Sequence, residues 1–117
     1  MTGRNQTVGG WGEQVAAGYL EGRGYNVIAR NVRTPYGEID IVAEKDGFTV
    51  FIEVKARTSS SLGPPEISVT AKKQGRMLAA AEHYAQQNEL DHWQIDVIAV
   101  ERKAGIKPEI THFENAI

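Results

Sequence analysis

A turn signal near the middle of the chain restricts the fold more than any other feature of the sequence. Asp46-Gly47 lies between residues 37–45 and residues 48–55, two runs in which polar and apolar side chains alternate. Asp-Gly is strongly favoured in two-residue hairpin loops, because the tight turn requires positive φ angles. A period of two residues is that of a strand with one buried face. The stretch therefore predicts an antiparallel β-hairpin.

The charged side chains of this hairpin are expected to share one face. Counting outward from Asp46-Gly47 places Asp40 opposite Glu53, and Glu38 opposite Lys55. Directly opposed side chains have Cβ atoms about 5 Å apart, and like charges at that distance destabilise a sheet. A divalent cation with oxygen ligands would relieve the repulsion between Asp40 and Glu53. The apolar side chains fall on the opposite face, which is expected to be core: Ile39, Ile41, Val50, Ile52 and Val54.

Length and composition favour one globular domain. The chain has 117 residues, which suits a single core, and no cysteine, which excludes disulfides and thiolate metal sites. Residues 1–7 are expected to form a loose tail and residues 8–117 a single domain. The net charge of −2 gives no global argument for a nucleic-acid partner. Neither a membrane-spanning run nor a secretory signal is expected, so a cytoplasmic protein is the simplest interpretation.

The rest of the pattern predicts two helices and three further strands. Helices are expected over residues 9–23 and 70–88, and strands over residues 25–32, 93–101 and 105–113. The order is αβββαββ, an α/β fold with a mixed central sheet flanked by helices. The second helix is expected to turn five side chains toward the core: Met77, Leu78, Ala81, Tyr84 and Ala85.

Asp40, Glu53 and Lys55 match the spacing of the PD-(D/E)xK nuclease signature, with Ile39 in place of the proline. Phosphodiester hydrolysis needs an activated water and stabilisation of charge on the phosphoryl oxygens. Asp40 and Glu53, helped by the backbone carbonyl of Val54, are the expected ligands of Mg²⁺ or Mn²⁺. Lys55 is expected to orient the attacking water or to offset charge on the phosphate.

Glu13 is a further candidate for the same site. It lies on one face of the first helix with Ala16, Ala17 and Leu20, so it is expected to face inward. There it would be an outer-shell ligand or a partner for Lys55.

The whole chain resembles the YraN-like family, small bacterial proteins with a restriction-endonuclease-like fold that are similar to archaeal Holliday-junction resolvases. The resemblance implies an αβββαβ nuclease core, with Glu13, Asp40, Glu53 and Lys55 at the active-site positions. It also implies branched or flapped DNA as the substrate. The resemblance rests on segments in a fixed order along nearly the whole chain: Gly12-Glu13, Tyr19-Leu20, Gly24-Tyr25, Asn31-Val32-Arg33, Gly37-Glu38-Ile39-Asp40, Glu53-Val54-Lys55-Ala56-Arg57, Val69-Thr70, Lys73-Gln74, Arg76 and Asp96-Val97.

Basic residues after the hairpin and in the second helix are expected to contact nucleic acid. A helix N-terminus also favours anions, although a solvated basic face is the alternative. The chain departs from its relatives at Ala71 and Gly75, where they often carry proline and a basic residue, and at Gln94, where they usually carry a basic residue. The expected contacts are Arg57, Lys72, Lys73 and Arg76.

The leading interpretation is a Mg²⁺- or Mn²⁺-dependent endonuclease that acts on DNA, with no membrane partner and with a homodimer left open. The first alternative is a non-catalytic nucleic-acid-binding or scaffold protein that retains the nuclease fold. The second is a structural domain whose hairpin charges only form ion pairs, such as Glu38 with Lys55. Asp96, inside an apolar strand, is expected to bond either backbone or a basic group. Surface positions are expected for His83, His92 and His112.

Overall fold

The computed structural model describes residues 8–57, 70–102 and 107–117, and within these ranges the predicted order αβββαββ is confirmed. The expected tail (1–7) and the Ser/Gly/Pro-rich stretch after the hairpin lie outside the described residues. The elements are α1 (Val8–Gly22), β1 (Asn26–Thr34), β2 (Gly37–Lys45), β3 (Phe48–Arg57), α2 (Ala71–Gln87), β4 (Trp93–Glu101) and β5 (Glu109–Phe113).

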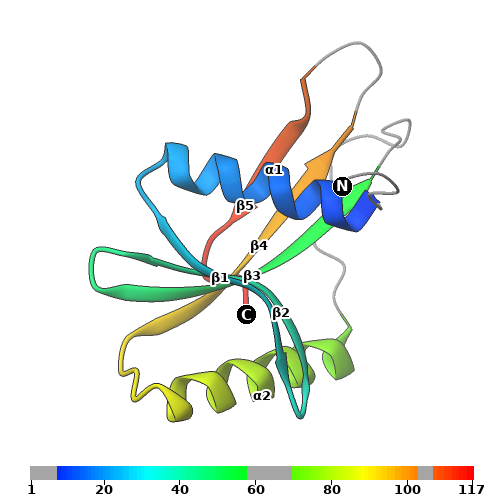
Figure 1. Cartoon of the computed structure of the whole chain (residues 1–117). Helices are drawn as coiled ribbons and strands as arrows, with labels where there is room; N and C mark the ends of the chain where they lie inside the picture. The colour runs from blue at the N-terminus through cyan, green and yellow to red at the C-terminus, as the bar shows by residue number, and fades with distance from the viewer. Residues whose placement is uncertain (1–7, 58–69, 103–106) are drawn as a thin grey trace, which may run out of the picture.

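The strands form one mixed sheet in the order β1-β2-β3-β4-β5. Neighbouring strands are antiparallel except β3 and β4, which are parallel. A parallel pair needs a crossover connection, and α2 lies within the segment that joins these two strands. The mixed α/β class is therefore as predicted, and the arrangement is compatible with a restriction-endonuclease-like core (Figure 1).

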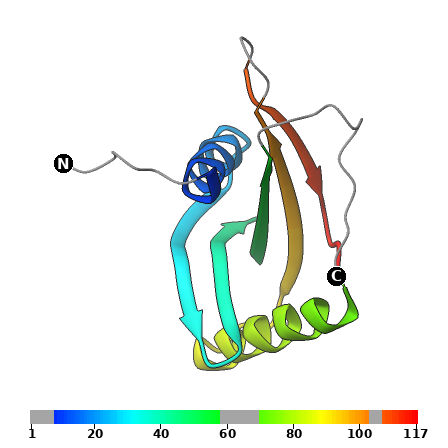
Figure 2. The same cartoon turned by 90° about the vertical axis from the view of Figure 1, so that its right-hand side faces the viewer.

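The two helices cover opposite faces of the sheet, as Figures 1 and 2 show. Ile41 and Val50 are buried on the side of α1, whereas Val42 and Phe51 are buried on the side of α2. The prediction of a single core face for the hairpin was therefore wrong for the half nearest the turn, because a second helix covers the other face. The four charged residues that were expected to share one face lie in the half farther from the turn: Glu38, Asp40, Glu53 and Lys55.

The predicted turn at Asp46-Gly47 is confirmed. Asp46 has φ 53° and Gly47 has φ 82°, the left-handed region that the tight turn requires. The register also follows the count from the turn, with Lys45 opposite Phe48. The observed ladder extends as far as Ile41 opposite Ile52.

Beyond that point β2 and β3 part. β2 continues to pair with β1, placing Arg33 opposite Glu38, while β3 continues beside β4 as far as Arg57. Ile39 packs in the cluster on the α2 side, although Ile41 belongs to the cluster on the α1 side, so β2 rotates between them. In β1, Asn31 has φ 54°, an irregularity at this same level of the sheet. The separation removes the expected Glu38–Lys55 pairing.

Helix α2 agrees closely with its prediction. Thr70 is the N-cap, with its hydroxyl accepting a hydrogen bond from the Lys73 N–H at 3.1 Å. Leu78 was expected to face the core, but it is 39% exposed, whereas Ala80 is buried. The helix turns about 100° per residue, so Leu78 lies at the edge of the buried stripe that contains Ala80 and Ala81. In the described part of the chain no helix combines the length and the apolarity needed to cross a membrane.

Candidate functional site

The carboxylate of Asp40 lies where β2 parts from β3. The backbone N–H of Val54 donates a hydrogen bond to Asp40 Oδ2 at 2.8 Å, so this side chain takes the place of a missing partner strand. In an extended strand, the N–H and C=O of one residue point to the same side. The carbonyl of Val54, a predicted metal ligand, therefore faces the same edge of β3 as Asp40.

Three neighbouring acids act on Asp40. Burial raises the pKa of the Asp40 carboxyl from 3.8 to about 7; the Val54 N–H opposes this rise, while the charges of Glu53, Glu13 and Glu38 add to it. The charges of these three acids thus all act on the Asp40 carboxyl group. Such repulsion is relieved by a proton or by a cation.

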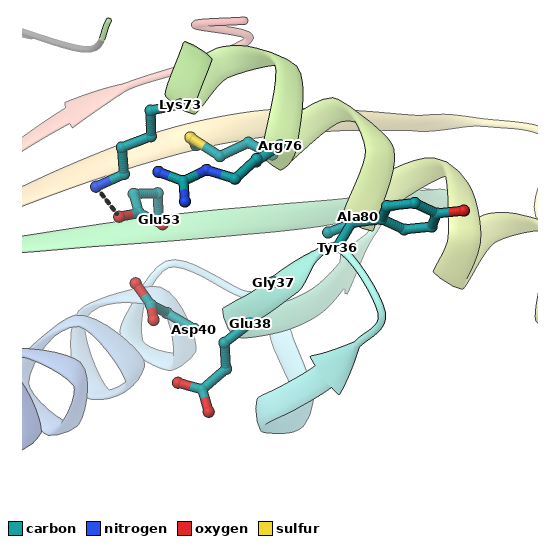
Figure 3. A pocket seen from close by; sticks show the side chains of 9 residues that line it. Tyr36, Gly37, Glu38, Asp40, Glu53, Lys73, Arg76 and Ala80 are labelled. Carbon is teal, nitrogen blue, oxygen red and sulfur yellow. Dashed lines mark ion pairs between the residues drawn. The ribbon is translucent and has the colours of Figure 1, made fainter.

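Asp40 and Glu53 line one pocket together with residues of α2, although the ladder that was expected to place them directly opposite each other ends at Ile41 and Ile52. Glu38, Asp40 and Glu53 come from the sheet, and Lys73 and Arg76 come from α2. Figure 3 shows the guanidinium of Arg76 reaching into this pocket above Glu53.

Lys73 is bound directly to one of the predicted metal ligands. Its Nζ lies 3.1 Å from Glu53 Oε2, the contact drawn as a dashed line in Figure 3. The sequence had assigned Glu53 to metal binding and Lys73 to nucleic-acid binding. The structure places these two side chains in one ion pair.

Glu13 lies in α1, in the opposite layer; it does not line the pocket, although its charge acts on Asp40. Helix α1 lies very close to β3, because a Cβ atom at Gly12 would be 2.7 Å from Ala56 Cβ, and only glycine fits there. This close approach holds the next residue, Glu13, near the sheet with its side chain 15% exposed. Its ion-pair partner is Arg30, at 3.8 Å, so the alternative of a pair with Lys55 was wrong.

Lys55 is half-buried in β3, opposite Ala99 of β4. Strand alternation puts it on the same face of the sheet as Glu53. Glu38 bonds Arg33 at 3.7 Å, so the simple explanation of Lys55 as the cross-strand partner of Glu38 was wrong. Lys55 lies beyond the residues that line the pocket of Asp40 and Glu53.

The four basic residues predicted to bind nucleic acid occupy different settings. Arg57 forms an ion pair with Glu101 at 2.8 Å, and the Glu101 side chain is only 3% exposed. Arg76 lines the pocket and is exposed, whereas Lys72 is exposed outside it. Arg76 and Lys73 are thus the two members of the set that border the acidic residues.

The donor atoms at this site are all oxygens. In the ranges given above, no three His, Asp or Glu side chains come close enough together to hold a metal ion by themselves. The carboxylates of Asp40 and Glu53 and the carbonyl of Val54 suit Mg²⁺ or Mn²⁺, which keep several water ligands and need few from the protein. Burial and the charges of the neighbouring acids, which together raise the pKa of Asp40, are further support for a cation there.

A second polar network was predicted only at Asp96, which was expected to bond backbone or a basic group and which bonds both. Asp96 is fully buried and accepts hydrogen bonds from the Gln94 side chain and the Asn115 N–H, and its Oδ2 lies 2.7 Å from His112 Nε2. The other ring nitrogen of His112 bonds the Tyr19 hydroxyl at 3.0 Å. The expected surface position of His112 was therefore wrong. The one available signal was an acid within the apolar strand around Asp96.

Comparison with known proteins identifies the family. Residues 12–100 match the model of a family described as "Uncharacterised protein family UPF0102". A UPF0102 protein of Syntrophotalea carbinolica is 45% identical, covering 99% of this chain and 95% of its own length. A UPF0102 protein of Syntrophomonas wolfei is 42% identical, covering 96% of this chain and 98% of its own length. The chain therefore belongs to the UPF0102 family, the YraN family that its sequence resembles.

Proposed function

We propose that this protein is a Mg²⁺- or Mn²⁺-dependent endonuclease that hydrolyses phosphodiester bonds of DNA. The observation that carries the proposal is the setting of Asp40, whose pKa is raised to about 7 by burial and by the neighbouring acids. Buried carboxyl groups that repel one another are costly for a fold. Strongly shifted acids beside a pocket are typical of sites that bind a cation or transfer protons.

Asp40, Glu53 and the carbonyl of Val54 would hold the ion. When bound, the ion supplies an activated water near neutral pH and neutralises charge on the phosphate. Glu13 acts from the α1 side and bonds water in the outer shell. The oxygen donors are fixed by the protein itself, since Asp40 is anchored on the Val54 N–H.

Lys55 provides the positive charge on the same side of β3 as Glu53. Its role is to orient the attacking water or to stabilise the charge that develops on the phosphate. Its ammonium group is available for this, because Glu38 bonds Arg33 instead. Arg76, exposed at the pocket, holds a neighbouring phosphate of the substrate.

The choice of DNA, and of branched or flapped DNA in particular, is supported by the family resemblance. The test is a cleavage assay on linear, flapped and four-way DNA, each with Mg²⁺, with Mn²⁺ and with a chelator. Asp40→Asn is the matched control, because an amide oxygen still accepts the Val54 hydrogen bond. We expect metal-dependent cleavage by the wild type only. Failure of the wild type to cut any of the substrates would overturn the proposal.

A non-catalytic nucleic-acid-binding protein is the second candidate. It is favoured by one observation, the engagement of Glu53 by Lys73 at 3.1 Å. This candidate predicts salt-dependent DNA binding that Arg76→Ala weakens, with no cleavage in either metal. The same substrate panel, followed by fluorescence anisotropy, separates the two candidates.

A further inference from the structure

The ion pair between Lys73 and Glu53 connects metal binding with substrate binding in the proposed nuclease. Glu53 is a proposed metal ligand, and Lys73 lies at the edge where a substrate phosphate would approach. In the pair, Lys73 Nζ is 3.1 Å from Glu53 Oε2, with the side chains 38% and 16% exposed. An ammonium group therefore already stands at the acidic residues as a counter-cation.

The position of Lys73 on α2 is not explained by the helix itself. Lys73 belongs to the first turn, where the helix dipole disfavours a cation. Its backbone is fixed, because its N–H donates to the N-cap hydroxyl of Thr70 at 3.1 Å. The side chain then extends across the pocket to Glu53 (Figure 3). The acids of the sheet are what favour its charge there.

The ion pair between Lys73 and Glu53 is also of a kind in which the lysine can exchange one anion for another. Partly exposed ion pairs are weak, because water screens them and both side chains lose rotamer freedom. A lysine has a flexible stem and a single point charge, so it can move to another anion without displacing the helix. Arg76, one turn along α2, lines the same pocket and is a second cation beside it.

We propose that Lys73 is an exchangeable counter-cation that couples substrate binding to metal binding. This inference rests on the nuclease function proposed above. In the metal-free protein Lys73 neutralises Glu53; in the complex it moves to a phosphate of the DNA, and Glu53 becomes a ligand of the metal. Glu53 cannot keep both cations close without strong repulsion between them. DNA that attracts Lys73 therefore strengthens metal binding, and the metal strengthens DNA binding by the same factor.

The first test measures Mn²⁺ affinity by calorimetry for the wild type and for Lys73→Met, without DNA. Lys73→Met removes the competing cation and is expected to bind Mn²⁺ about fivefold or more tightly, a typical coupling between two sites. Lys72→Met is the matched control, because it removes the same charge from an adjacent exposed position and is expected to change the affinity less than about twofold.

The second test repeats the titrations with a flapped DNA whose linkages are phosphorothioates, recovered intact on a gel afterwards. DNA is expected to strengthen Mn²⁺ binding more in the wild type than in Lys73→Met. Lys73→Arg keeps a charge that can exchange, so it should restore the larger effect. If Lys73 were only structural, its substitution would not change the factor by which DNA strengthens Mn²⁺ binding.

The outcomes separate this inference from the proposed function. If the wild type cleaves DNA but Lys73→Met matches the wild type in both titrations, the exchange is wrong and the nuclease stands. If the wild type neither binds Mn²⁺ nor cleaves, both are wrong. Tighter Mn²⁺ binding by Lys73→Met, together with a smaller effect of DNA, supports the exchange.

Discussion

Asp40 Oδ2 accepts a hydrogen bond from the backbone N–H of Val54 at 2.8 Å, just beyond the end of the β2–β3 ladder. One carboxyl group therefore serves two purposes. Its oxygen accepts the hydrogen bond of a β3 backbone N–H at the edge from which β2 has separated. Its charge belongs to the proposed metal site. Substitutions can separate the two purposes, because an amide keeps the acceptor and loses the charge.

Asp40→Asn and Asp40→Ala are expected to differ in stability and to agree in function. In a chelator, Asp40→Asn should be at least as stable as the wild type, since it removes repulsion and keeps the bond. Asp40→Ala should be less stable than Asp40→Asn by about 1 kcal/mol, the net value of a hydrogen bond. Neither should bind Mn²⁺. Urea denaturation measures the stabilities, and calorimetry measures Mn²⁺ binding. Equal stabilities of the two variants would show that the hydrogen bond from Val54 to Asp40 does not stabilise the fold.

The stability of the metal-free protein should depend on pH through Asp40. The pKa of this carboxyl is about 7 when folded and 3.8 as an ordinary aspartate, so between these values the folded state binds the extra proton. The free energy of unfolding therefore falls as the pH rises from about 4 to about 7, and then becomes level. Asp40→Asn should flatten this slope. Thermal melts in a chelator across this range provide the measurement.

Lys55→Met should lower the rate of DNA cleavage. The change keeps the aliphatic stem and removes the charge, so cleavage is expected to slow by orders of magnitude while Mn²⁺ binding and the fold persist. Lys107→Met, at an exposed position near β5, is the control. Single-turnover assays give the rates. A wild-type rate in Lys55→Met would remove Lys55 from the catalytic residues.

Arg57→Met should affect stability more than DNA binding. It leaves the carboxylate of Glu101, which is 3% exposed, without its partner. An unpaired buried charge costs about 1–3 kcal/mol or more. Arg33→Met is the control, because its partner Glu38 is 45% exposed and the loss should be within about 0.5 kcal/mol. Urea denaturation and DNA titration decide between the roles. A loss of DNA affinity without a loss of stability would restore Arg57 to the binding surface.

His112→Ala should destabilise the fold without affecting the metal site. It removes the link between Tyr19 and the fully buried Asp96, and we expect a loss of about 2–4 kcal/mol. His92→Ala, at an exposed position, should lose much less. Equilibrium denaturation measures the difference. Unchanged Mn²⁺ affinity in His112→Ala is the second expectation, and a lowered affinity would connect this network to the pocket.

The hairpin was predictable because its determinants are local. Asp46-Gly47 sets the turn, and alternation sets the register as far as Ile41 and Ile52. The point where the strands part was not predictable, since it depends on how β1 and β4 compete for the two strands. The bond from Val54 to Asp40 follows from that competition, so no pattern within the hairpin could reveal it.

The contacts between distant elements were missed for a related reason. Lys73 meets Glu53 only because the packing of Ala80 and Ala81 fixes the rotation of α2 on the sheet. His112 likewise draws its partners from two other elements, α1 and β4. Local sequence identifies which residues are polar and inward, but the pairing among them is a property of tertiary packing.

The parallel pairing of β3 with β4 bears on the order in which the molecule folds. β1, β2 and β3 are joined by short turns and can associate as a local meander, which brings Asp40 and Glu53 together early. β4 can join β3 only after the chain has crossed back through α2, and such long-range pairing is slow. The two acids therefore meet before Lys73 can neutralise Glu53. Divalent cations present during refolding should consequently speed the early phase, because they screen the repulsion between Asp40 and Glu53 before Lys73 pairs with Glu53.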